Sequence, residues 1–180
     1  RDGHRQTRQV RGLELRRKEP GDDIGVVIDP PLKEANLKGF TAPVPLSRGK
    51  YLEVFCQVNP NRFRLVSLTS PLFQRAWFLR GFENFLMDMM LHKEFVHDLL
   101  DIIMEYTKGV IKEAVEYKID AFFLMDDWGQ QEGLLMSPAM WREYFKPRMK
   151  MLCDIIKDKG IFLFFHSCGD IEDIIPEIIE

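Results

Sequence analysis

The chain has 180 residues, of which 46% are hydrophobic and 29% charged, and its formal net charge is −3. This composition is typical of a soluble globular protein, and the slight acidity argues against general binding to nucleic acid. Apolar runs stay well short of the ~18 residues that a membrane span needs, and no signal peptide is visible, so we expect no membrane association. Three cysteines without the spacing of a disulfide framework favour a reducing, cytoplasmic location.

The first part of the chain, residues 1–47, has weak periodicity, many prolines and a basic opening that is typical of a solvated face. We expect an irregular segment of loops and small hairpins, with a short strand at 24–28, packed on a barrel domain that spans residues 48–180. The chain begins at Arg1 rather than Met and stops at Glu180 inside an unfinished apolar period. These ends predict a fragment that holds the central part of a larger domain.

From residue 48 onward, strand and helix patterns alternate. Ser70-Pro71 and Ser137-Pro138 each resemble a helix N-cap followed by proline, Pro147 should kink or restart a helix, and Gly160 should end one. The expected elements are a helix at 48–58, a strand at 63–69, a helical stretch at 72–90 broken near Gly81, a helix at 95–117, a strand at 121–125, helices from 138 to 159, a strand at 161–165 and a last helix capped by Asp170.

This alternation predicts an α/β fold of the (β/α)8 TIM-barrel type. Because a whole barrel needs roughly 250 residues, about three to four βα units would be present here. The two strands at 121–125 and 161–165 are continuously apolar, as in a sheet buried on both faces, and each ends in polar residues. Ligands bind at the carboxyl ends of such strands, so both polar clusters should share one rim.

His166 and Cys168 follow the last of these strands and flank one residue. Side chains at i and i+2 of an extended segment point to the same side, and imidazole with thiolate suits zinc. The spacing alone favours the alternative, a strand-end histidine satisfied by hydrogen bonds beside a small buried cysteine. A catalytic zinc site also needs a third protein ligand. Cys153, on the apolar face of a helix, is expected to be structural.

Asp126 and Asp127 follow the strand at 121–125, and Trp128 and Gln130 come next. Adjacent strand residues point to opposite faces, so only one of the two carboxylates can point into the barrel mouth. That carboxylate would bind cationic or N–H groups, or raise the basicity of a metal-bound histidine. The alternative is a loop pair that caps backbone amides. Trp128 is suited to stack on a planar ligand, or to close the rim of the barrel.

The run DAFFLMDDWGQQEGLLMSPAMWREYFKPRMK, followed by GIFLFFHSCGDIEDIIPEIIE, resembles the uroporphyrinogen decarboxylase superfamily, and PLFQRAWFLRGFENFLMDM is similar to its middle segment. The resemblance covers residues 60–180. One branch comprises cobamide-dependent methyltransferases, whose zinc site has the pattern His-x-Cys and a distant second cysteine. His166 and Cys168 match the first part of that pattern, so the resemblance implies a zinc site whose third ligand lies beyond Glu180.

The resemblance therefore implies an enzyme that moves a methyl group between a corrinoid, either free or carried on a corrinoid protein, and a small thiol. Asp127 is the expected catalytic carboxylate, and Asp126, Trp128 and Gln130 would contact the substrate at the barrel mouth. The other branch, the true decarboxylases, implies metal-free decarboxylation of uroporphyrinogen with a tetrapyrrole held at the same rim. A third reading is a non-catalytic protein that binds a tetrapyrrole or corrinoid. Bound zinc separates the first reading from the other two.

Overall fold

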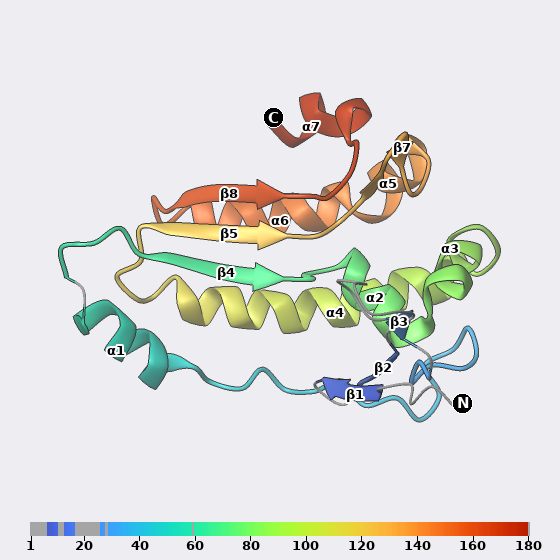
Figure 1. Ribbon diagram of the computed structural model, residues 1–180, viewed down its shortest axis with the longest axis horizontal. Helices are drawn as coiled ribbons and strands as arrows, with labels where there is room; N and C mark the ends of the chain where they lie inside the picture. The colour runs from blue at the N-terminus through green and yellow to red at the C-terminus, as the bar shows by residue number, and fades with distance from the viewer. Residues whose placement is uncertain (1–6, 11–12, 17–25, 28, 59, 180) are drawn as a thin grey trace, which may run out of the picture.

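The computed structural model describes residues 7–10, 13–16, 26–27, 29–58 and 60–179. Its strands and helices follow one another along the chain as Figure 1 shows. In chain order they are β1 (Thr7–Val10), β2 (Leu13–Arg16), β3 (Val26–Val27), α1 (Gly49–Val58), β4 (Leu65–Thr69), α2 (Phe73–Arg80), α3 (Phe82–Leu91), α4 (Lys93–Ala114), β5 (Ala121–Met125), β6 (Gly129–Gln130), β7 (Gly133–Leu134), α5 (Pro138–Tyr144), α6 (Lys146–Lys157), β8 (Phe162–His166), a 3-10 turn at Glu172–Ile174, and α7 (Ile175–Ile179).

A parallel sheet of three strands, in the order β4-β5-β8, is the centre of the fold. Helices α2, α3 and α4 connect β4 to β5, and α5 and α6 connect β5 to β8, so each crossover is helical, as a parallel sheet requires. The strands run in the same direction, and their carboxyl ends meet at one edge (Figure 1). The predicted α/β barrel fold of TIM type, present in part, is confirmed.

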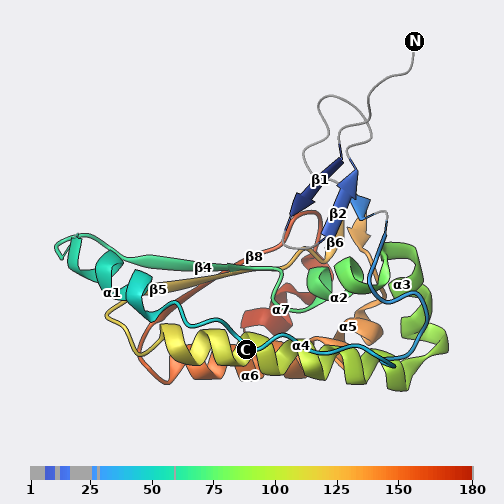
Figure 2. The same ribbon diagram turned by 90° about the horizontal axis from the view of Figure 1, so that it is seen from below.

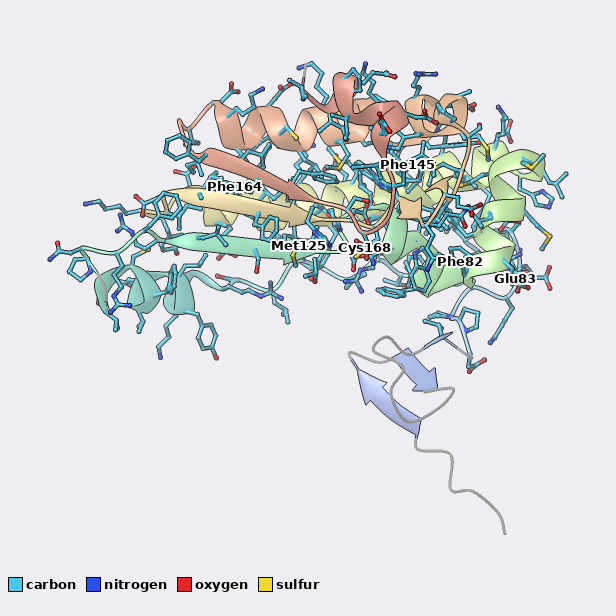
Figure 3. The ribbon with its side chains drawn as sticks, turned by 45° about the horizontal axis from the view of Figure 1, so that its top comes forward. Phe82, Glu83, Met125, Phe145, Phe164 and Cys168 are labelled. Atoms are coloured by element: carbon cyan, nitrogen blue, oxygen red, sulfur yellow. The ribbon has the colours of Figure 1, made fainter. Side chains whose placement is uncertain are left out.

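The two faces of this sheet have different surroundings. Side chains alternate between the faces along each strand. On the helix-covered face, alternate residues of the three strands pack into the core with α4 and α6, and these residues are Val66, Leu68, Phe122, Leu124, Leu163 and Phe165. On the open face, Phe162 is 67% exposed and Phe164 is 48% exposed. Phe164 lies on β8 in the side-chain view (Figure 3).

The N-terminal part of the described chain contains an antiparallel sheet in the order β1-β2-β3. Figure 2 shows this sheet at one end of the molecule, while the segment after it runs along α4 toward α1. The strand predicted at 24–28 is present as β3, and its other positions lie outside the described residues. Residues 30–47 contain no helix or strand, and within them Leu32 is buried in the core.

Most of the predicted helix boundaries agree with the structure. The helical stretch at 72–90 breaks at Gly81, whose φ is 89°, and Pro147 lies in the first turn of α6 after a new start. Ser137 caps α5, since its side chain accepts a hydrogen bond from the amide of Met140. Among the described helices, none has the length and apolar character that crossing a membrane would demand.

The predicted cap at Ser70-Pro71 is wrong. Helix α2 begins at Phe73, and Ser70 lies before it with a φ of 55°. The amide of Ser70 donates to the carbonyl of Met125 and so extends the pairing between β4 and β5. The first backbone amides of α2 instead donate hydrogen bonds to the carboxylate of Asp126, the residue that follows β5.

Candidate functional site

The carboxyl ends of β5 and β8 bring Asp127, His166 and Cys168 together, with one ligand atom of each within 4.8 Å of the others. Cys168 Sγ lies 3.3 Å from His166 Nε2, and Asp127 Oδ1 lies 3.5 Å from the same nitrogen. The parallel register places Met125 beside His166, so the residues that follow each strand meet at the same edge. Met125 and Cys168 are labelled at this edge in Figure 3.

The loop that follows β8 is held against β6 by backbone contacts. The amide of Gly129 donates to the carbonyl of Cys168, and the amide of Asp170 donates to the carbonyl of Gln130. A Cβ atom on Gly169 would lie 2.3 Å from the backbone carbon of Gly129, and Gly169 has a φ of 75°. Only glycine combines that backbone conformation with so close an approach. The loop that carries Cys168 is therefore fixed before any ligand binds.

Asp127 is held by hydrogen bonds on both carboxylate oxygens. Oδ1 accepts from the backbone amide of Cys168 at 2.8 Å, and Oδ2 accepts from Gln74 Nε2 at 2.7 Å. A separate hydrogen bond between the thiol of Cys168 and the carboxylate of Asp127 is the main cause that raises the pKa of the thiol, and desolvation and the charge of Asp127 act in the same direction. The carboxylate thus disfavours a free thiolate, whereas a cation between the two groups would stabilise both negative charges.

Asp126 points the other way. Its carboxylate is completely buried and accepts from the amides of Phe73, at 2.7 Å, and Gln74, at 2.9 Å. Burial raises the pKa of Asp126 to about 7, although the hydrogen bonds from the first turn of α2 act in the opposite direction. This is the backbone-capping arrangement that was the alternative for the aspartate pair. Asp127 also accepts from one backbone amide, that of Cys168, but it differs from Asp126 in that it faces His166 as well.

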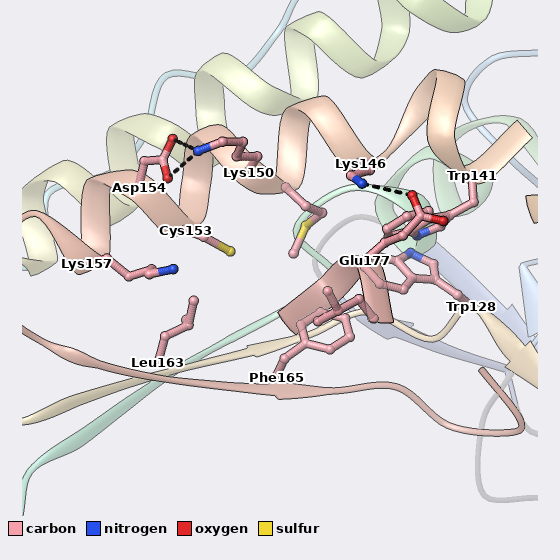
Figure 4. A pocket seen from close by; sticks show the side chains of 12 residues that line it. Trp128, Trp141, Lys146, Lys150, Cys153, Asp154, Lys157, Leu163, Phe165 and Glu177 are labelled. Atoms are coloured by element: carbon pink, nitrogen blue, oxygen red, sulfur yellow. Dashed lines mark hydrogen bonds and ion pairs between the residues drawn. The ribbon is translucent and has the colours of Figure 1, made fainter. Parts of the chain in front are cut away.

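Trp128 lies within the core rather than in the barrel mouth. Its ring stacks on Phe165 with centroids 4.7 Å apart and meets Trp141 edge-on at 5.5 Å. It lines a cavity of about 270 Å³ between α6, β8 and α7 (Figure 4). The indole nitrogens of Trp128 and Trp141 are buried and have no hydrogen-bond partner among the described residues. Of the two predicted roles, a ring packed near the rim fits this placement better than stacking on a ligand.

Gln130 is exposed and belongs to β6, which pairs with β7 in a small antiparallel hairpin. Among the predicted site residues, the structure therefore brings Asp127, His166 and Cys168 into contact and leaves Gln130 beside them. Asp126 and Trp128 are buried behind them. Sequence reasoning missed Gln74, because a glutamine in the first turn of a helix has no distinguishing pattern.

The donor set suits a metal ion of the zinc class. An imidazole nitrogen, a thiol sulfur and a carboxylate oxygen are all zinc ligands in proteins. In a tetrahedral zinc site with the usual bond lengths, nitrogen and sulfur ligand atoms lie about 3.5 Å apart, and nitrogen and oxygen about 3.4 Å. The separations of 3.3 Å and 3.5 Å seen here are close to those values. The residues present fit zinc.

The fold and the site define an α/β protein of the TIM-barrel type with a polar cluster at the carboxyl ends of its parallel strands. Residues 16–180 match the family described as Uroporphyrinogen decarboxylase (URO-D). The chain belongs to this family. Its fold is similar to the solved structure of a methyltransferase from Methanosarcina mazei, with a TM-score of 0.72 and 19% sequence identity over 94% of this chain. The chain spans 50% of that protein's length. No curated protein matches significantly.

Proposed function

We propose that this protein is a zinc-dependent enzyme of the uroporphyrinogen decarboxylase superfamily that transfers a methyl group between a corrinoid and a thiol. The observation that carries the proposal is the convergence of His166 Nε2, Cys168 Sγ and a carboxylate oxygen of Asp127 at one edge of the sheet. The similarity of the fold to a methyltransferase and the match to the His-x-Cys pattern support the same reaction class.

In this proposal His166 and Cys168 are ligands of the metal. Asp127 takes one of two positions: a third ligand through Oδ1, or a partner that orients His166 through the 3.5 Å contact. The family resemblance implies a third ligand beyond Glu180. The structure offers Asp127 as a candidate within the described residues, and a ligand from elsewhere would leave Asp127 in the orienting role.

The chemistry that zinc would supply is a lower pKa for the thiol of a bound substrate. With a methylated corrinoid as the substrate, the thiol sulfur would take the methyl group, the corrinoid would keep the electron pair of the broken cobalt–carbon bond, and the thiol proton would pass to solvent. The chain's own part is to hold the site in place. Asp127 fixes the amide of Cys168, and Gly169 lets the loop turn sharply against β6. Gln130 and the exposed apolar side chains of the open face would contact the corrinoid.

The second candidate is metal-free decarboxylation of uroporphyrinogen, which the description of the matching family favours. A partly exposed carboxylate such as Asp127 at the barrel rim would then hold the pyrrole N–H groups of the substrate. His166 and Cys168 would have no ligand role in that reaction.

The decisive measurement is the zinc content of the purified protein, compared with that of His166→Ala and Cys168→Ser. We expect about one zinc per chain in the wild type and loss of zinc in both variants, because two remaining protein ligands hold zinc poorly. His92→Ala and Cys153→Ser are matched controls and should keep their zinc, since His92 lies at the junction of α3 and α4 and Cys153 lies on α6, both away from the site.

Three results separate the readings. Zinc that depends on His166 and Cys168, together with methylation of a thiol by a methylated corrinoid, supports the proposal. Zinc-free protein that turns over a porphyrinogen supports the decarboxylase instead. Zinc-free protein that binds a tetrapyrrole or corrinoid without turnover would reject both enzymatic functions.

A further inference from the structure

Gln74, in the first turn of α2, bonds to both aspartates that follow β5. Its backbone amide donates to Asp126 Oδ1 at 2.9 Å, and its side-chain Nε2 donates to Asp127 Oδ2 at 2.7 Å. We propose that Gln74 is a positioning residue, which sets the orientation of the Asp127 carboxylate toward the metal and so determines the metal affinity. This inference rests on the proposed zinc function and extends it to a residue that no sequence pattern identified.

The direction of each hydrogen bond in this network is fixed by chemistry. An ionised carboxylate can only accept, so the amide nitrogen of Gln74 must face Asp127. The amide oxygen then faces away, where it accepts from the hydroxyl of Ser70 at 3.1 Å. The hydrogen bonds from Ser70 to Gln74 and from Gln74 to Asp127 can therefore run in one direction only, which holds the glutamine amide in a single orientation.

Ser70, the first residue of this series of hydrogen bonds, is itself held in place. It has a φ of 55°, a backbone conformation that is uncommon outside glycine and that persists only where the surroundings enforce it. Its amide is bonded to the carbonyl of Met125, and its side chain is buried. The network therefore begins at a fixed point on the paired ends of β4 and β5 and ends at the candidate metal site.

The hydrogen bond from Gln74 determines which oxygen of the Asp127 carboxylate faces the candidate metal site. Gln74 occupies Oδ2, so Oδ1 is the oxygen that faces His166 and Cys168. Without the side-chain amide of Gln74, only the backbone amide of Cys168 would hold the carboxylate, and its plane could turn away from the orientation that aims Oδ1 at His166. Groups that orient metal ligands in this manner commonly change metal affinity by about 10- to 100-fold when they are replaced.

A purely structural role for Gln74 makes a different prediction. The bond that caps α2 through Asp126 uses the backbone amide of Gln74, which survives any substitution of the side chain except proline. Replacing the side chain should therefore leave the helix intact and affect only Asp127. The variant Gln74→Met retains the length and most of the volume of the side chain and removes its polar groups.

The experiment compares the zinc affinity of the wild type with that of Gln74→Met and Ser70→Ala, measured by competition with a chromophoric chelator. Gln131→Met is the matched control, since Gln131 is exposed in the turn between β6 and β7 at the same edge of the sheet. We expect the dissociation constant to rise about 10- to 100-fold in Gln74→Met, less in Ser70→Ala, and not in the control. Substitution with Co²⁺ provides a second measurement, because the visible spectrum of the wild type should change in Gln74→Met and stay unchanged in the control.

The outcomes distinguish this inference from the function on which it rests. If the wild type binds zinc through His166 and Cys168 and Gln74→Met binds it equally well with an unchanged Co²⁺ spectrum, Gln74 has no positioning role and the proposed function stands. If the wild type binds no zinc, the proposed function and this inference both fail. A lower affinity in Gln74→Met, at a temperature where thermal unfolding in chelator shows it fully folded, supports the inference.

Discussion

Asp126 and Asp127 are neighbours in the sequence, yet they belong to opposite sides of the sheet. On the helix-covered side, the carboxylate of Asp126 is completely buried and bonded to the amides that begin α2. On the open side, the carboxylate of Asp127 meets His166 and Cys168 at the edge of the sheet. The same functional group at the same strand end therefore supports the fold in one position and forms the candidate site in the next.

The difference follows from alternation and from what each face contacts. Side chains of consecutive residues leave an extended segment on opposite sides. The helix-covered side offers the first backbone amides of α2 in a dry environment, where they need side-chain oxygens as hydrogen-bond acceptors. The open side offers the imidazole of His166 and the thiol of Cys168, both exposed to solvent. The groups that surround each aspartate, rather than its residue type, therefore determine whether it supports the fold or forms the candidate site.

Exchange of each carboxylate for an amide should separate the two roles, and this gives the largest expected effect. Asp126→Asn should lower the free energy of unfolding by about 2 kcal/mol, because an NH₂ group replaces one acceptor and faces a backbone N–H in a buried site. It should leave zinc affinity nearly unchanged. Asp127→Asn should do the reverse, with weaker zinc binding and little loss of stability. Chemical denaturation and zinc titration of both variants test this, and equal destabilisation by the two would remove the contrast.

The pH dependence of stability should identify Asp126 as well. Burial raises its pKa from 3.8 to about 7 in the folded protein, so the folded state binds a proton more tightly than the unfolded state. Its contribution to stability is therefore complete below pH 3.8 and is lost as the pH rises through about 7. The charge of the neighbouring Asp127 raises the pKa of Asp126 as well.

The test of this dependence is the free energy of unfolding of the wild type minus that of Asp126→Asn, measured in chelator between pH 4 and pH 8. We expect the difference to fall with rising pH. The subtraction cancels the contributions of the carboxyl groups that the two proteins share. A flat difference would mean that Asp126 stays ionised throughout.

Two cysteines allow the same comparison between a buried and an exposed side chain, and here we expect the smallest effect. Cys153 lies on α6 beside the cavity at Trp128, and burial raises its pKa to about 11, while Cys168 is exposed in the loop after β8. We expect iodoacetamide at pH 8 to modify Cys168 at least about 10-fold faster than Cys153, since burial limits both access and ionisation. Zinc should protect Cys168 and leave Cys153 unaffected. Mass spectrometry of the modified protein measures both rates, and protection of Cys153 by zinc would contradict this assignment.

Sequence patterns predicted the helices and strands of this fold well where nearby residues determine them. The apolar runs became β5 and β8, and Ser137 caps α5 through an amide three residues away. The same pattern at Ser70-Pro71 failed because a carboxylate 53 positions along the chain bonds to the amide of Phe73 in its place. A cap of this kind depends on the pairing of β4 with β5, which periodicity cannot reveal.

The candidate site was predictable to a similar extent. The spacing of His166 and Cys168 predicted zinc ligands only together with the family resemblance, and the shared edge of parallel strands predicted that an aspartate would lie near them. Which aspartate it would be depends on the exact end of β5. Gln74 became visible only through its contacts. The substrate role of Gln130, the bound zinc and the corrinoid and thiol partners stay predictions, whereas the completely buried carboxylate of Asp126 caps α2 instead of facing a substrate.

The contact between Gly129 and Gly169 has a consequence for how binding and folding are linked. Because the two backbones already touch, the conformational entropy of the His166–Gly169 loop is lost when the sheet assembles and not when a metal ion arrives. An ion would meet an ordered set of donors and bind with little further loss of chain freedom. The same coupling makes the donors sensitive to strand register. A slip of β8 by one residue against β5 would turn His166 to the other face and dismantle the cluster without altering any of its residues.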